Sequence, residues 1–369
     1  MQTMHVARMH KIGEPMVLER IPRPTAGCGD VVVAVAACGL VPNLANVLRM
    51  WDQWFPYLPL PKLPSSFGLD VAGTISDIDD PAGYFRIGER VYVSPGLSCG
   101  SCDSCQANEP INCRDFTFRG YFGFAANSQS LYDRYPHGGF GEYISAPIQN
   151  LVRLPENVCF EAGARMGYLG TAYASLRKLR AGPGKSVLVN GITGTLGLGA
   201  CLLALAMGVT RILGTGRNSD LIKKVEALAP GRISILRFGE GSIADFARLQ
   251  TRGNGVDGVV DCLAPGADGT LMMDAIRGIR RGGAMVNVNG IGEPVMLDVK
   301  WMQAHQVALI GNNWFTTEEG QHVADMAGSG QLDLSILKHI RFALSDINNA
   351  ISELHDRRDG GFSNFVVIP

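Results

Sequence analysis

The sequence predicts an α/β protein in which a doubly wound parallel sheet is joined to a mostly β-stranded domain. Its 369 residues exceed the usual length of one domain. Residues 1–161 contain short strand-like segments between turn residues, whereas residues 162–311 alternate short apolar segments with helical ones. Such βαβα alternation is typical of a parallel sheet covered by helices on both faces. We therefore expect two domains of different architecture, with residues 312–369 returning to the first.

The individual segments support this division. In the first domain, Asp30–Val35 and Asp70–Ile75 are strand-like and are bounded by Gly and Pro. In the second, we expect strands over Ser186–Val189, Arg211–Leu213, Gly258–Asp261 and Ala284–Val288, and helices over Leu196–Met207, Asp220–Leu228 and Thr270–Arg280. A helical stretch after Gly311 and a strand-like tail over Phe365–Ile368 complete the chain.

Composition and charge exclude several classes of function. Apolar residues make up 46% and charged residues 18%, which favours a compact protein with large buried cores. The formal net charge is -1, so we expect neither a nucleic acid nor an anionic membrane as partner. The first residues lack a signal-peptide pattern, and the apolar run 197–209 is too short to span a bilayer. We therefore expect a cytoplasmic protein whose nine cysteines are metal ligands or thiols.

A glycine-rich turn connects the first strand of the parallel sheet to its helix. Gly191, Gly194 and Gly197 follow that strand with the spacing GxxGxxG, which differs from the regular GxGxxG pattern. Glycines permit a tight turn and close backbone approach, so a diphosphate can bind at the helix N-terminus. The alternative is an ordinary glycine turn, but the strand–turn–helix context favours a dinucleotide.

The end of the second strand indicates which nicotinamide cofactor binds. An NAD site usually places a carboxylate there to hold the ribose hydroxyls. Gly216, Arg217 and Asn218 occupy that turn instead, and the Arg217 guanidinium can bind a 2′-phosphate. A solvated surface arginine is the alternative. We expect NADP(H) to be favoured over NAD(H).

Four cysteines lie close together within residues 95–115. Cys99, Cys102, Cys105 and Cys113 have the spacing CxxCxxCx₇C in a loop rich in Gly, Ser, Asp and Asn. Four thiolates suit one closed, tetrahedral zinc site that crosslinks a loop with little core, so we expect one structural Zn²⁺ per chain. An iron–sulfur cluster or four free thiols are the alternatives, although ferredoxin spacings differ from this one.

These motifs together resemble the zinc-type alcohol dehydrogenases of the medium-chain dehydrogenase/reductase superfamily. The resemblance covers nearly the whole chain, and it implies a GroES-like catalytic domain over residues 1–161 and a Rossmann NADP-binding domain over 162–311. Residues 312–369 would return to the catalytic domain. The resemblance also implies the residues that contact the cofactor beside the glycines and the ribose turn: Thr171, Thr193, Thr195, Leu196, Cys262, Leu263, Asn289 and Gly290.

The departures from the family pattern concern its catalytic zinc. The three ligand positions of that zinc fall on Val41, Leu69 and Gly167. None of these side chains binds zinc, so we expect no catalytic zinc. The chain is also similar to the zinc-free quinone reductases and double-bond reductases of the superfamily, which share the GxxGxxG spacing. Those relatives usually lack the cysteine lobe, so the chain combines features of both branches.

Loss of the metal favours one kind of chemistry. Zinc polarises a carbonyl in the dehydrogenases, and direct ketone reduction without zinc needs a substitute. An α,β-unsaturated carbonyl accepts hydride at its β-carbon, and hydrogen-bond donors then hold the enolate oxygen. We therefore expect NADPH-dependent reduction of an enone, enal or quinone-like C=C bond. A zinc-independent alcohol/carbonyl dehydrogenase and a noncatalytic NADPH-binding protein are the alternatives.

Four residues are candidates for the catalytic chemistry. Asn43, supported by Asn46, is a candidate donor to the substrate oxygen, although it suits a helix cap before Leu44 equally well. Asp70 takes the acidic position beside the lost zinc and is a candidate acid, although a structural ion pair is the more usual role of such a residue. Tyr57 and Tyr168 are further candidate proton donors.

The loop Trp51–Leu58 is rich in aromatic residues. By resemblance it borders the substrate cleft, where an aromatic wall would suit a bulky apolar or aromatic small molecule. A packed subunit contact is an equally good interpretation. The resemblance and the apolar composition imply a homodimer or homotetramer.

Overall fold

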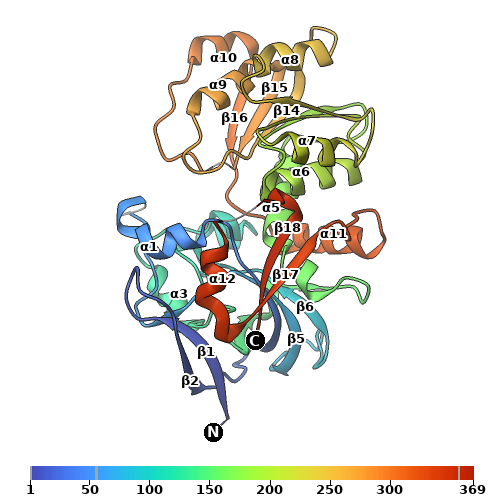
Figure 1. Ribbon diagram of the computed structural model, residues 1–369. Coiled ribbons are helices and arrows are strands. Elements are labelled where there is room, and N and C mark those ends of the chain that lie inside the picture. The colour runs from blue at the N-terminus through green and yellow to red at the C-terminus, as the bar shows by residue number, and fades with distance from the viewer. Residues whose placement is uncertain (1, 55–56, 289, 356–357) are drawn as a thin grey trace.

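The protein has two lobes joined by helices and by a returning C-terminal segment, as the computed structural model shows (Figure 1). The structure describes residues 2–54, 57–288, 290–355 and 358–369. The upper lobe in Figure 1 contains the parallel sheet and the lower lobe contains most other strands. Among the described residues, no helix has the combined length and apolar character needed to cross a membrane.

The parallel sheet has six strands in the order β13-β12-β11-β14-β15-β16. In chain order this is the 3-2-1-4-5-6 arrangement of dinucleotide-binding sheets. Its strands are β11 (Ser186–Asn190), β12 (Arg211–Gly216), β13 (Ile233–Arg237), β14 (Val256–Asp261), β15 (Ile279–Asn287) and β16 (Ala308–Gly311). Adjacent strands pair in parallel throughout, for example Leu188 with Leu213 and with Val259. The predicted doubly wound fold is confirmed.

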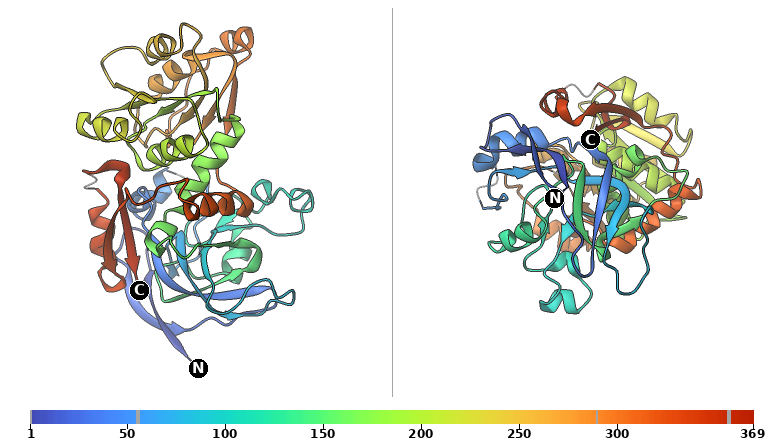
Figure 2. Two further views of the ribbon diagram at one scale, coloured as in Figure 1. Left: turned by 90° about the vertical axis from the view of Figure 1, so that its right-hand side faces the viewer. Right: turned by 90° about the horizontal axis from the view of Figure 1, so that it is seen from below.

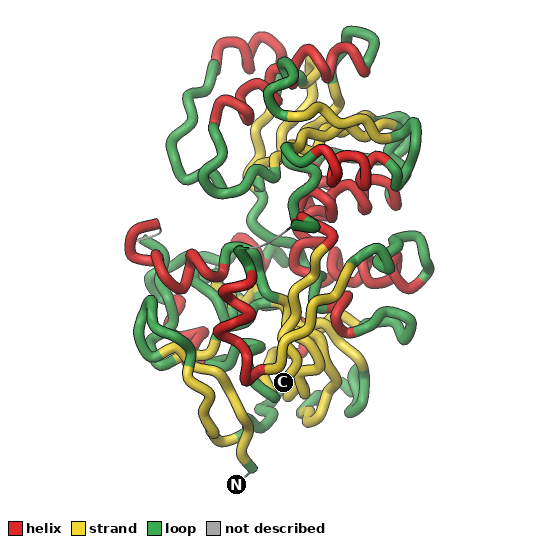
Figure 3. The backbone as a smooth tube through the Cα atoms, viewed as in Figure 1, coloured by secondary structure: helices red, strands yellow, loops and turns green. Residues whose placement is uncertain are grey.

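Helices lie on both faces of this sheet, as Figure 3 shows in red against the yellow strands. They are α5 (Met166–Lys178), α6 (Thr195–Ala206), α7 (Ser219–Glu226), α8 (Ile243–Gln250), α9 (Gly269–Arg277) and α10 (Val299–His305). The helix expected over Thr270–Arg280 ends at Arg277, and β15 already begins at Ile279. Gly278 separates the two elements, and Ile279 is buried in the sheet. The apolar pattern therefore continues from the helix into the strand and hides the boundary between them.

The lower lobe is built on a seven-stranded sheet in the order β10-β6-β5-β3-β18-β17, with β9 also pairing with β3. These strands are β3 (Asp30–Gly39), β5 (Asp70–Ile78), β6 (Arg90–Val93), β9 (Tyr143–Pro147), β10 (Leu151–Arg153), β17 (Lys338–Ala343) and β18 (Ser363–Ile368). The last two come from the C-terminal segment, which has already returned to this lobe at α11 (Thr317–Gly328) (Figure 2). Two segments far apart in sequence therefore form one sheet.

Smaller elements complete the lower lobe. A three-stranded sheet has the order β2-β1-β4, and β7 pairs with β8 beside the cysteine-rich loop. The remaining elements are β1 (Thr3–Met9), β2 (Val17–Pro22), β4 (Ser65–Ser66), β7 (Gly96–Leu97), β8 (Thr117–Phe118), α1 (Leu44–Trp54), α2 (Asp103–Gln106), α3 (Ser128–Arg134), α4 (Phe160–Gly163) and α12 (Ile347–Glu353). The carboxyl ends of the parallel strands face this lobe, and the candidate site lies there.

Candidate active site and metal centre

The glycine-rich turn is closed by backbone contacts that only glycine permits. Gly191 has φ +86°, in the left-handed region, and it leads directly from β11 into the turn. A Cβ on Gly197 would lie 2.1 Å from the Gly191 carbonyl oxygen. Gly194 precedes α6, and no side chain caps that helix. The first amides of α6 are therefore left for another hydrogen-bond acceptor.

A buried hydroxyl at the same place fits a bound diphosphate. Thr195 is 6% exposed, and its Oγ1 atom is one of the few buried side-chain polar atoms of the described chain without a hydrogen-bond partner. A buried hydroxyl without a partner costs free energy, which an anionic ligand at the N-terminus of α6 would relieve. The turn thus fits the diphosphate of a nicotinamide dinucleotide, held by Gly194, Thr195 and Leu196.

Three buried polar side chains fix the strand ends beneath this turn. The Asn190 amide donates to Asp261 Oδ1 at 2.7 Å, and the Thr215 hydroxyl donates to Asn190 Oδ1 at 2.7 Å. The Gly191 amide in turn donates to Thr215 Oγ1 at 2.9 Å. All three side chains are fully buried, so this network joins β11, β12 and β14 rigidly. Sequence reasoning missed it because the partners lie far apart along the chain.

The expected ribose turn has one exposed arginine and one helix cap. Arg217 is exposed immediately after β12, and its carbonyl accepts a hydrogen bond from Arg237 Nε at 3.2 Å. Asn218 Oδ1 accepts from the amides of Asp220 at 2.9 Å and Leu221 at 3.2 Å, so this side chain caps α7. The Asn218 side chain is therefore engaged in capping α7, whereas the Arg217 side chain is exposed.

The other expected cofactor residues gather at the same edge of the sheet. The Cys262 amide donates to Asn190 O at 2.9 Å, and the Gly290 amide donates to Leu263 O at 2.9 Å. The Thr193 carbonyl is already used, since it accepts from the Gly361 amide at 2.9 Å. Asn289 lies outside the described residues. The C-terminal segment therefore packs directly on the glycine-rich turn.

A cavity of about 240 Å³ lies where the family would hold its catalytic zinc. Val41, Leu69 and Gly167 all contribute to its wall, although the first and the last are 126 positions apart in the sequence. The structure thus brings the three predicted positions together. The full lining is Val41, Leu69, Asp70, Phe118, Tyr121, Gly167, Tyr168, Thr171, Leu196, Val288, Asn313 and Trp314.

Asp70 is the acidic group of this cavity. It is 1% exposed, and its Oδ1 atom accepts a hydrogen bond from the Tyr92 hydroxyl at 2.8 Å. A Cβ on Gly167 would lie 2.2 Å from the same oxygen, so the absent side chain at Gly167 leaves the carboxyl group its space. Burial raises the pKa of Asp70 to about 7, against the opposing effects of Tyr92, the Arg165 charge and the Gly167 amide.

Two tyrosines lie beside Asp70. Burial raises the pKa of Tyr121 well above its ordinary value, and charge on Tyr168 and Asp70 raises it further. Tyr121 therefore keeps its hydroxyl proton near neutral pH and can donate it in a hydrogen bond. The Arg165 guanidinium lies 5.4 Å from the centroid of the Tyr168 ring, and Arg165 Nη2 donates to Gly361 O at 2.9 Å. Tyr92, Tyr121 and Arg165 were not expected from the sequence.

Other predicted residues lie away from the cavity wall. The side-chain oxygen of Asn43 accepts from Asn46 Nδ2 at 2.9 Å, which matches the expected support, but Asn43 does not line the cavity. Tyr57 is 75% exposed. Trp51 is buried, with its ring centroid 4.9 Å from that of Phe122.

Among the described side chains, the aromatic wall of the cavity comes from segments other than the loop Trp51–Leu58. Phe118, Tyr121 and Tyr168 line the cavity together with Trp314, and the Phe118 and Trp314 rings lie 4.7 Å apart. The loop residues Phe55 and Pro56 lie outside the described residues. The sequence could not indicate this wall because Phe118 and Trp314 are separated by almost two hundred residues.

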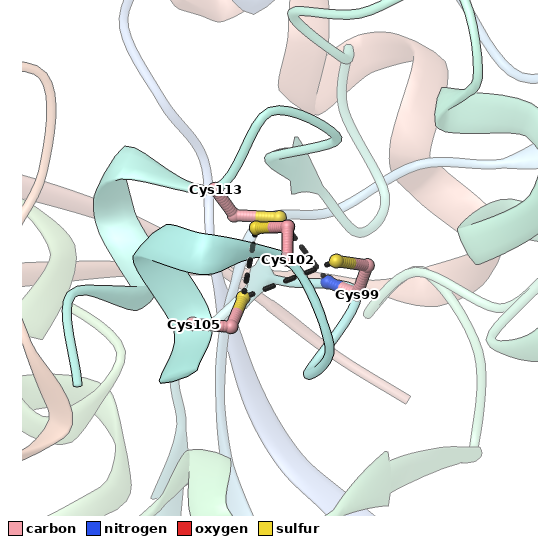
Figure 4. Close-up of side chains that lie close together, drawn as sticks. All are labelled: Cys99, Cys102, Cys105 and Cys113. Atoms are coloured by element: carbon pink, nitrogen blue, oxygen red, sulfur yellow. Dashed lines mark hydrogen bonds between the residues drawn. The ribbon is translucent and has the colours of Figure 1, made fainter. Parts of the chain in front are cut away.

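The four cysteines form a compact cluster in the segment between β7 and β8 (Figure 4). The sulfurs of Cys99, Cys102, Cys105 and Cys113 all lie within 4.8 Å of one another. Cys102 Sγ and Cys105 Sγ are 3.6 Å apart, and Cys99 Sγ and Cys105 Sγ are 4.0 Å apart. Tetrahedral ligation with Zn–S bonds of about 2.3 Å requires sulfurs about 3.8 Å apart.

Backbone amides lower the pKa of Cys99 and Cys102, whereas burial raises the pKa of Cys113 to about 12. The amides of Cys99 and Asp115 each donate to Cys113 Sγ at 3.3 Å. A hydrogen bond from the Ser101 amide is the main cause that lowers the pKa of Cys99 to about 6. Among the described residues, this is the one group of three or more His, Cys, Asp or Glu side chains close enough to hold a metal. The cluster fits one structural zinc.

Comparisons with known proteins agree with this architecture. An alcohol dehydrogenase GroES-like domain matches residues 27–156. The chain is 25% identical over 333 residues to an alcohol dehydrogenase of Geobacillus stearothermophilus, covering 89% of this chain and 90% of that one. It is 27% identical over 344 residues to the human quinone oxidoreductase, covering 91% and 88%.

A solved structure shows the same fold. A dehydrogenase from Sinorhizobium meliloti 1021, bound to NADP, superposes with a TM-score of 0.82 at 20% identity and covers all of both chains. The two-lobed fold and the GroES-like domain define a dehydrogenase architecture. The chain therefore contains an alcohol dehydrogenase GroES-like domain and is an oxidoreductase that is similar over most of its length to alcohol dehydrogenases and quinone oxidoreductases.

Proposed function

We propose that this oxidoreductase uses NADPH to reduce an activated C=C bond, such as that of an enone, enal or quinone-like compound, without a catalytic zinc. The observation that carries the proposal is the cavity formed by Val41, Leu69 and Gly167 around Asp70. Valine, leucine and glycine offer no side-chain ligand to a metal, and one carboxylate alone is a poor zinc site. The cavity instead offers a buried acid among apolar and aromatic side chains.

The protein must supply two things beside the hydride that a reduced nicotinamide provides. The first is a hydrogen-bond donor for the oxygen on which negative charge develops. Tyr121, Tyr168 and Asn313 line the cavity and carry donors, so they are better placed than Asn43 and Tyr57. Donation by Asn43 stays a prediction.

The second requirement is a proton. Because burial raises the pKa of Asp70 to about 7, a large fraction of this carboxyl group is protonated at neutral pH. As hydride adds to the β-carbon, the electron pair of the C=C bond moves toward the carbonyl oxygen. The Asp70 proton then passes to the α-carbon, and the hydrogen bond from the Tyr92 hydroxyl stabilises the carboxylate left behind.

Cavity size refines the proposed substrate. A volume of about 240 Å³ lies below the range of about 300–1,000 Å³ that is usual for ligand pockets. Its wall includes Phe118, Tyr121 and Trp314, which suit an apolar or aromatic molecule. This favours a compact substrate over the bulky one that the aromatic loop led us to expect.

Deuterium labelling tests the reaction. Purified protein is given NADPH deuterated at the transferable position and a compact aryl enone, and the product is analysed by NMR. We expect deuterium at the β-carbon of a saturated ketone, and Asp70→Asn should reduce the rate. Deuterium on the carbinol carbon of an allylic alcohol would contradict the proposal and support a zinc-independent carbonyl dehydrogenase. Tight NADPH binding with no turnover across enones, enals, quinones and alcohols would support a noncatalytic role.

We further propose a cytoplasmic homodimer or homotetramer that acts on a small molecule. β16 ends the parallel sheet, and Met296 and Val299, which precede it, are 91% and 70% exposed. Association commonly covers such strand edges and apolar side chains. Sedimentation equilibrium tests this proposal, and a mass equal to one chain at micromolar concentration would contradict it.

A further inference from the structure

A buried arginine lies where the two lobes meet. Arg165 immediately precedes α5, close to the starts of α6 and β18, and it is 5% exposed (Figure 1). A charged side chain is rarely buried unless its hydrogen-bonding groups have partners. The contacts of Arg165 therefore indicate which parts of the molecule this side chain holds together. The reaction proposed above gives Arg165 no role of its own.

The Arg165 guanidinium binds backbone carbonyls of both lobes. Its Nη2 atom donates to Gly361 O at 2.9 Å and to Thr195 O at 3.4 Å, and its Nη1 atom donates to Ser363 O at 3.2 Å. Gly361 and Ser363 belong to the C-terminal segment of the lower lobe, whereas Thr195 is the first residue of α6 in the upper lobe. A planar guanidinium can bind several acceptors in fixed directions, which an ammonium group cannot do. One side chain therefore ties the two lobes together.

The C-terminal segment that Arg165 holds packs tightly on the glycine-rich turn. The Gly361 amide donates to Thr193 O at 2.9 Å. A Cβ on Gly361 would lie 2.4 Å from the Gly194 carbonyl oxygen, and a Cβ on Gly360 would lie 2.5 Å from Thr193 O. The segment and the turn thus leave no space between them. A shift of the C-terminal segment would therefore also move the turn to which we assign the diphosphate.

Arg165 also reaches the side chains of the substrate cavity. Its guanidinium carbon lies 5.4 Å from the centroid of the Tyr168 ring, and Tyr168 lines the cavity one helical turn further along α5. The Arg165 charge also acts on Asp70, since it opposes the rise in the pKa of that carboxyl group. Arg165 itself does not line the cavity. It therefore acts on the cavity only through its neighbours.

We propose that Arg165 is a positioning residue that fixes the cofactor turn and the substrate cavity in one relative placement. The inference rests on the proposed reductase function, because this placement sets the distance between the bound cofactor and a substrate in the cavity. A misplacement of reacting groups by about 1 Å can lower a rate by about a hundredfold. Each ligand can still bind at its own site in that case, so the rate of transfer should depend on Arg165 more than either affinity does.

Steady-state kinetics of Arg165→Lys in the full-length protein test the proposal. Lysine keeps the positive charge but lacks the planar group that binds three carbonyls. With NADPH and a compact aryl enone, we expect kcat to fall at least about tenfold, while KM for the enone and Kd for NADPH change less than about threefold. An arginine that served only the stability of the fold would leave kcat of the folded protein unchanged. An unchanged kcat in folded Arg165→Lys would therefore overturn the proposal.

A second arginine provides a matched control. The Arg90 side chain is 19% exposed, its Nη2 atom donates to the Val158 carbonyl, and its guanidinium carbon lies 4.0 Å from the centroid of the Phe160 ring. These contacts resemble those of Arg165, but all of them lie within the lower lobe. Arg90→Lys should therefore leave kcat unchanged. If it lowers kcat as much as Arg165→Lys does, the effect is not specific to the junction of the lobes, and the proposal is overturned.

A second variant and a measurement without turnover complete the test. Gly361→Ala keeps Arg165, but its methyl group would push the C-terminal segment away from Gly194, so kcat should fall here as well. An unchanged kcat in folded Gly361→Ala would contradict the proposal.

Hydrogen exchange of the cofactor-free protein, followed by mass spectrometry of peptides, reports the contact directly. Exchange of the Gly361 amide, which donates to Thr193 O, should be at least about tenfold faster in Arg165→Lys and unchanged in Arg90→Lys. A parent protein that turns over no enone would refute the reductase function. Unchanged exchange at Gly361 in Arg165→Lys would instead overturn the role of Arg165.

Discussion

The cysteine lobe and the central cavity occupy the two places where the family resemblance suggests metal, and they differ in the atoms they offer. In the lobe, four sulfurs lie within 4.8 Å of one another and accept hydrogen bonds from backbone amides. At the cavity, Val41, Leu69 and Gly167 also converge in the fold but present only carbon and hydrogen. The fold brings the expected ligand positions together at both places, whereas side-chain atoms that can bind a metal are present at those positions only in the cysteine lobe.

The cavity shows what occupies the space when ligands are replaced. Gly167 has no side chain, and the Asp70 carboxyl group lies where a Cβ would be. The Tyr92 hydroxyl, which donates to Asp70 Oδ1 at 2.8 Å, holds that carboxyl group in place. A carboxyl group that is buried without a cation in direct contact holds its proton more tightly. We propose that the cavity has thereby become a site for proton donation, while the lobe has kept a purely structural metal.

The largest expected effect is that of removing one zinc ligand from the cysteine lobe. Cys113→Ser should abolish zinc binding and unfold the lobe, because structural zinc sites contribute on the order of 10 kcal/mol to the folding of small domains. Elemental analysis should give about one zinc per chain in the parent and none in the variant. Cys28→Ser, at an exposed cysteine outside the lobe, is the control and should keep its zinc. Two zincs per parent chain would contradict the proposed metal-free cavity.

The next largest effect concerns the Asp70 carboxyl group in the cavity and the stability of the protein as pH changes. The pKa of Asp70 is about 7 in the folded protein and 3.8 as the ordinary value, so between these pH values the folded state binds more protons than the unfolded state. Stability should therefore fall as pH rises from about 4 to about 7, by about 4 kcal/mol from this group. Asp70→Asn should remove this decline, as measured by urea unfolding at several pH values.

A matched variant and a kinetic readout sharpen the test of Asp70. Asp77→Asn, on the same strand β5, should leave the decline unchanged. In the parent, the rate of enone reduction at saturating NADPH should fall as pH rises through about 7, because the proton donor is lost. Identical pH–stability curves for the parent and Asp70→Asn would refute the assignment of the raised pKa.

Much of the fold could be predicted from the sequence because periodic apolar patterns are local. The strand–turn–helix at Gly191–Gly197 and the strand Asp70–Ile75 were both placed within a few residues of their observed limits. The end of the helix near Arg277 was missed because Ile279 continues the apolar pattern into a strand. Gly278 alone separates the helix from the strand there, and the apolar pattern does not show this boundary.

The candidate site could be predicted only where the family pattern supplied positions. Val41, Leu69, Gly167, Asp70 and Tyr168 were identified in this way, and the structure brings them to one cavity. The Tyr92 hydrogen bond to Asp70 and the Phe118–Trp314 contact depend on strand register and on the return of the C-terminal segment. No local signal in the sequence encodes such contacts.

The third prediction tests whether the protein prefers NADPH, the cofactor that we propose, over NADH. Arg217→Ala should reduce the preference for NADPH over NADH by about 1–3 kcal/mol, since a charge-assisted hydrogen bond to the 2′-phosphate is lost. Fluorescence titration with both cofactors measures the ratio of the two Kd values. Arg211→Ala, at the opposite end of the same strand β12, is the control. Equal affinity of the parent for both cofactors would contradict this role of Arg217.

The smallest expected effect concerns the buried Thr195 hydroxyl at the start of α6. This helix begins at the glycine-rich turn, and its residue Leu196 lines the cavity. Thr195 Oγ1 is buried without a partner, so Thr195→Val should leave the stability of the cofactor-free protein unchanged or slightly higher. The same substitution should weaken NADPH binding by about 0.5–1.5 kcal/mol, as loss of one hydrogen bond would. Thr195→Ser keeps the hydroxyl and should bind NADPH nearly as the parent does. Calorimetric titration and thermal unfolding measure the two effects separately. If Thr195→Val lowers stability and leaves the Kd for NADPH unchanged, the hydroxyl serves the fold alone, and the diphosphate must be held by the backbone amides of the turn.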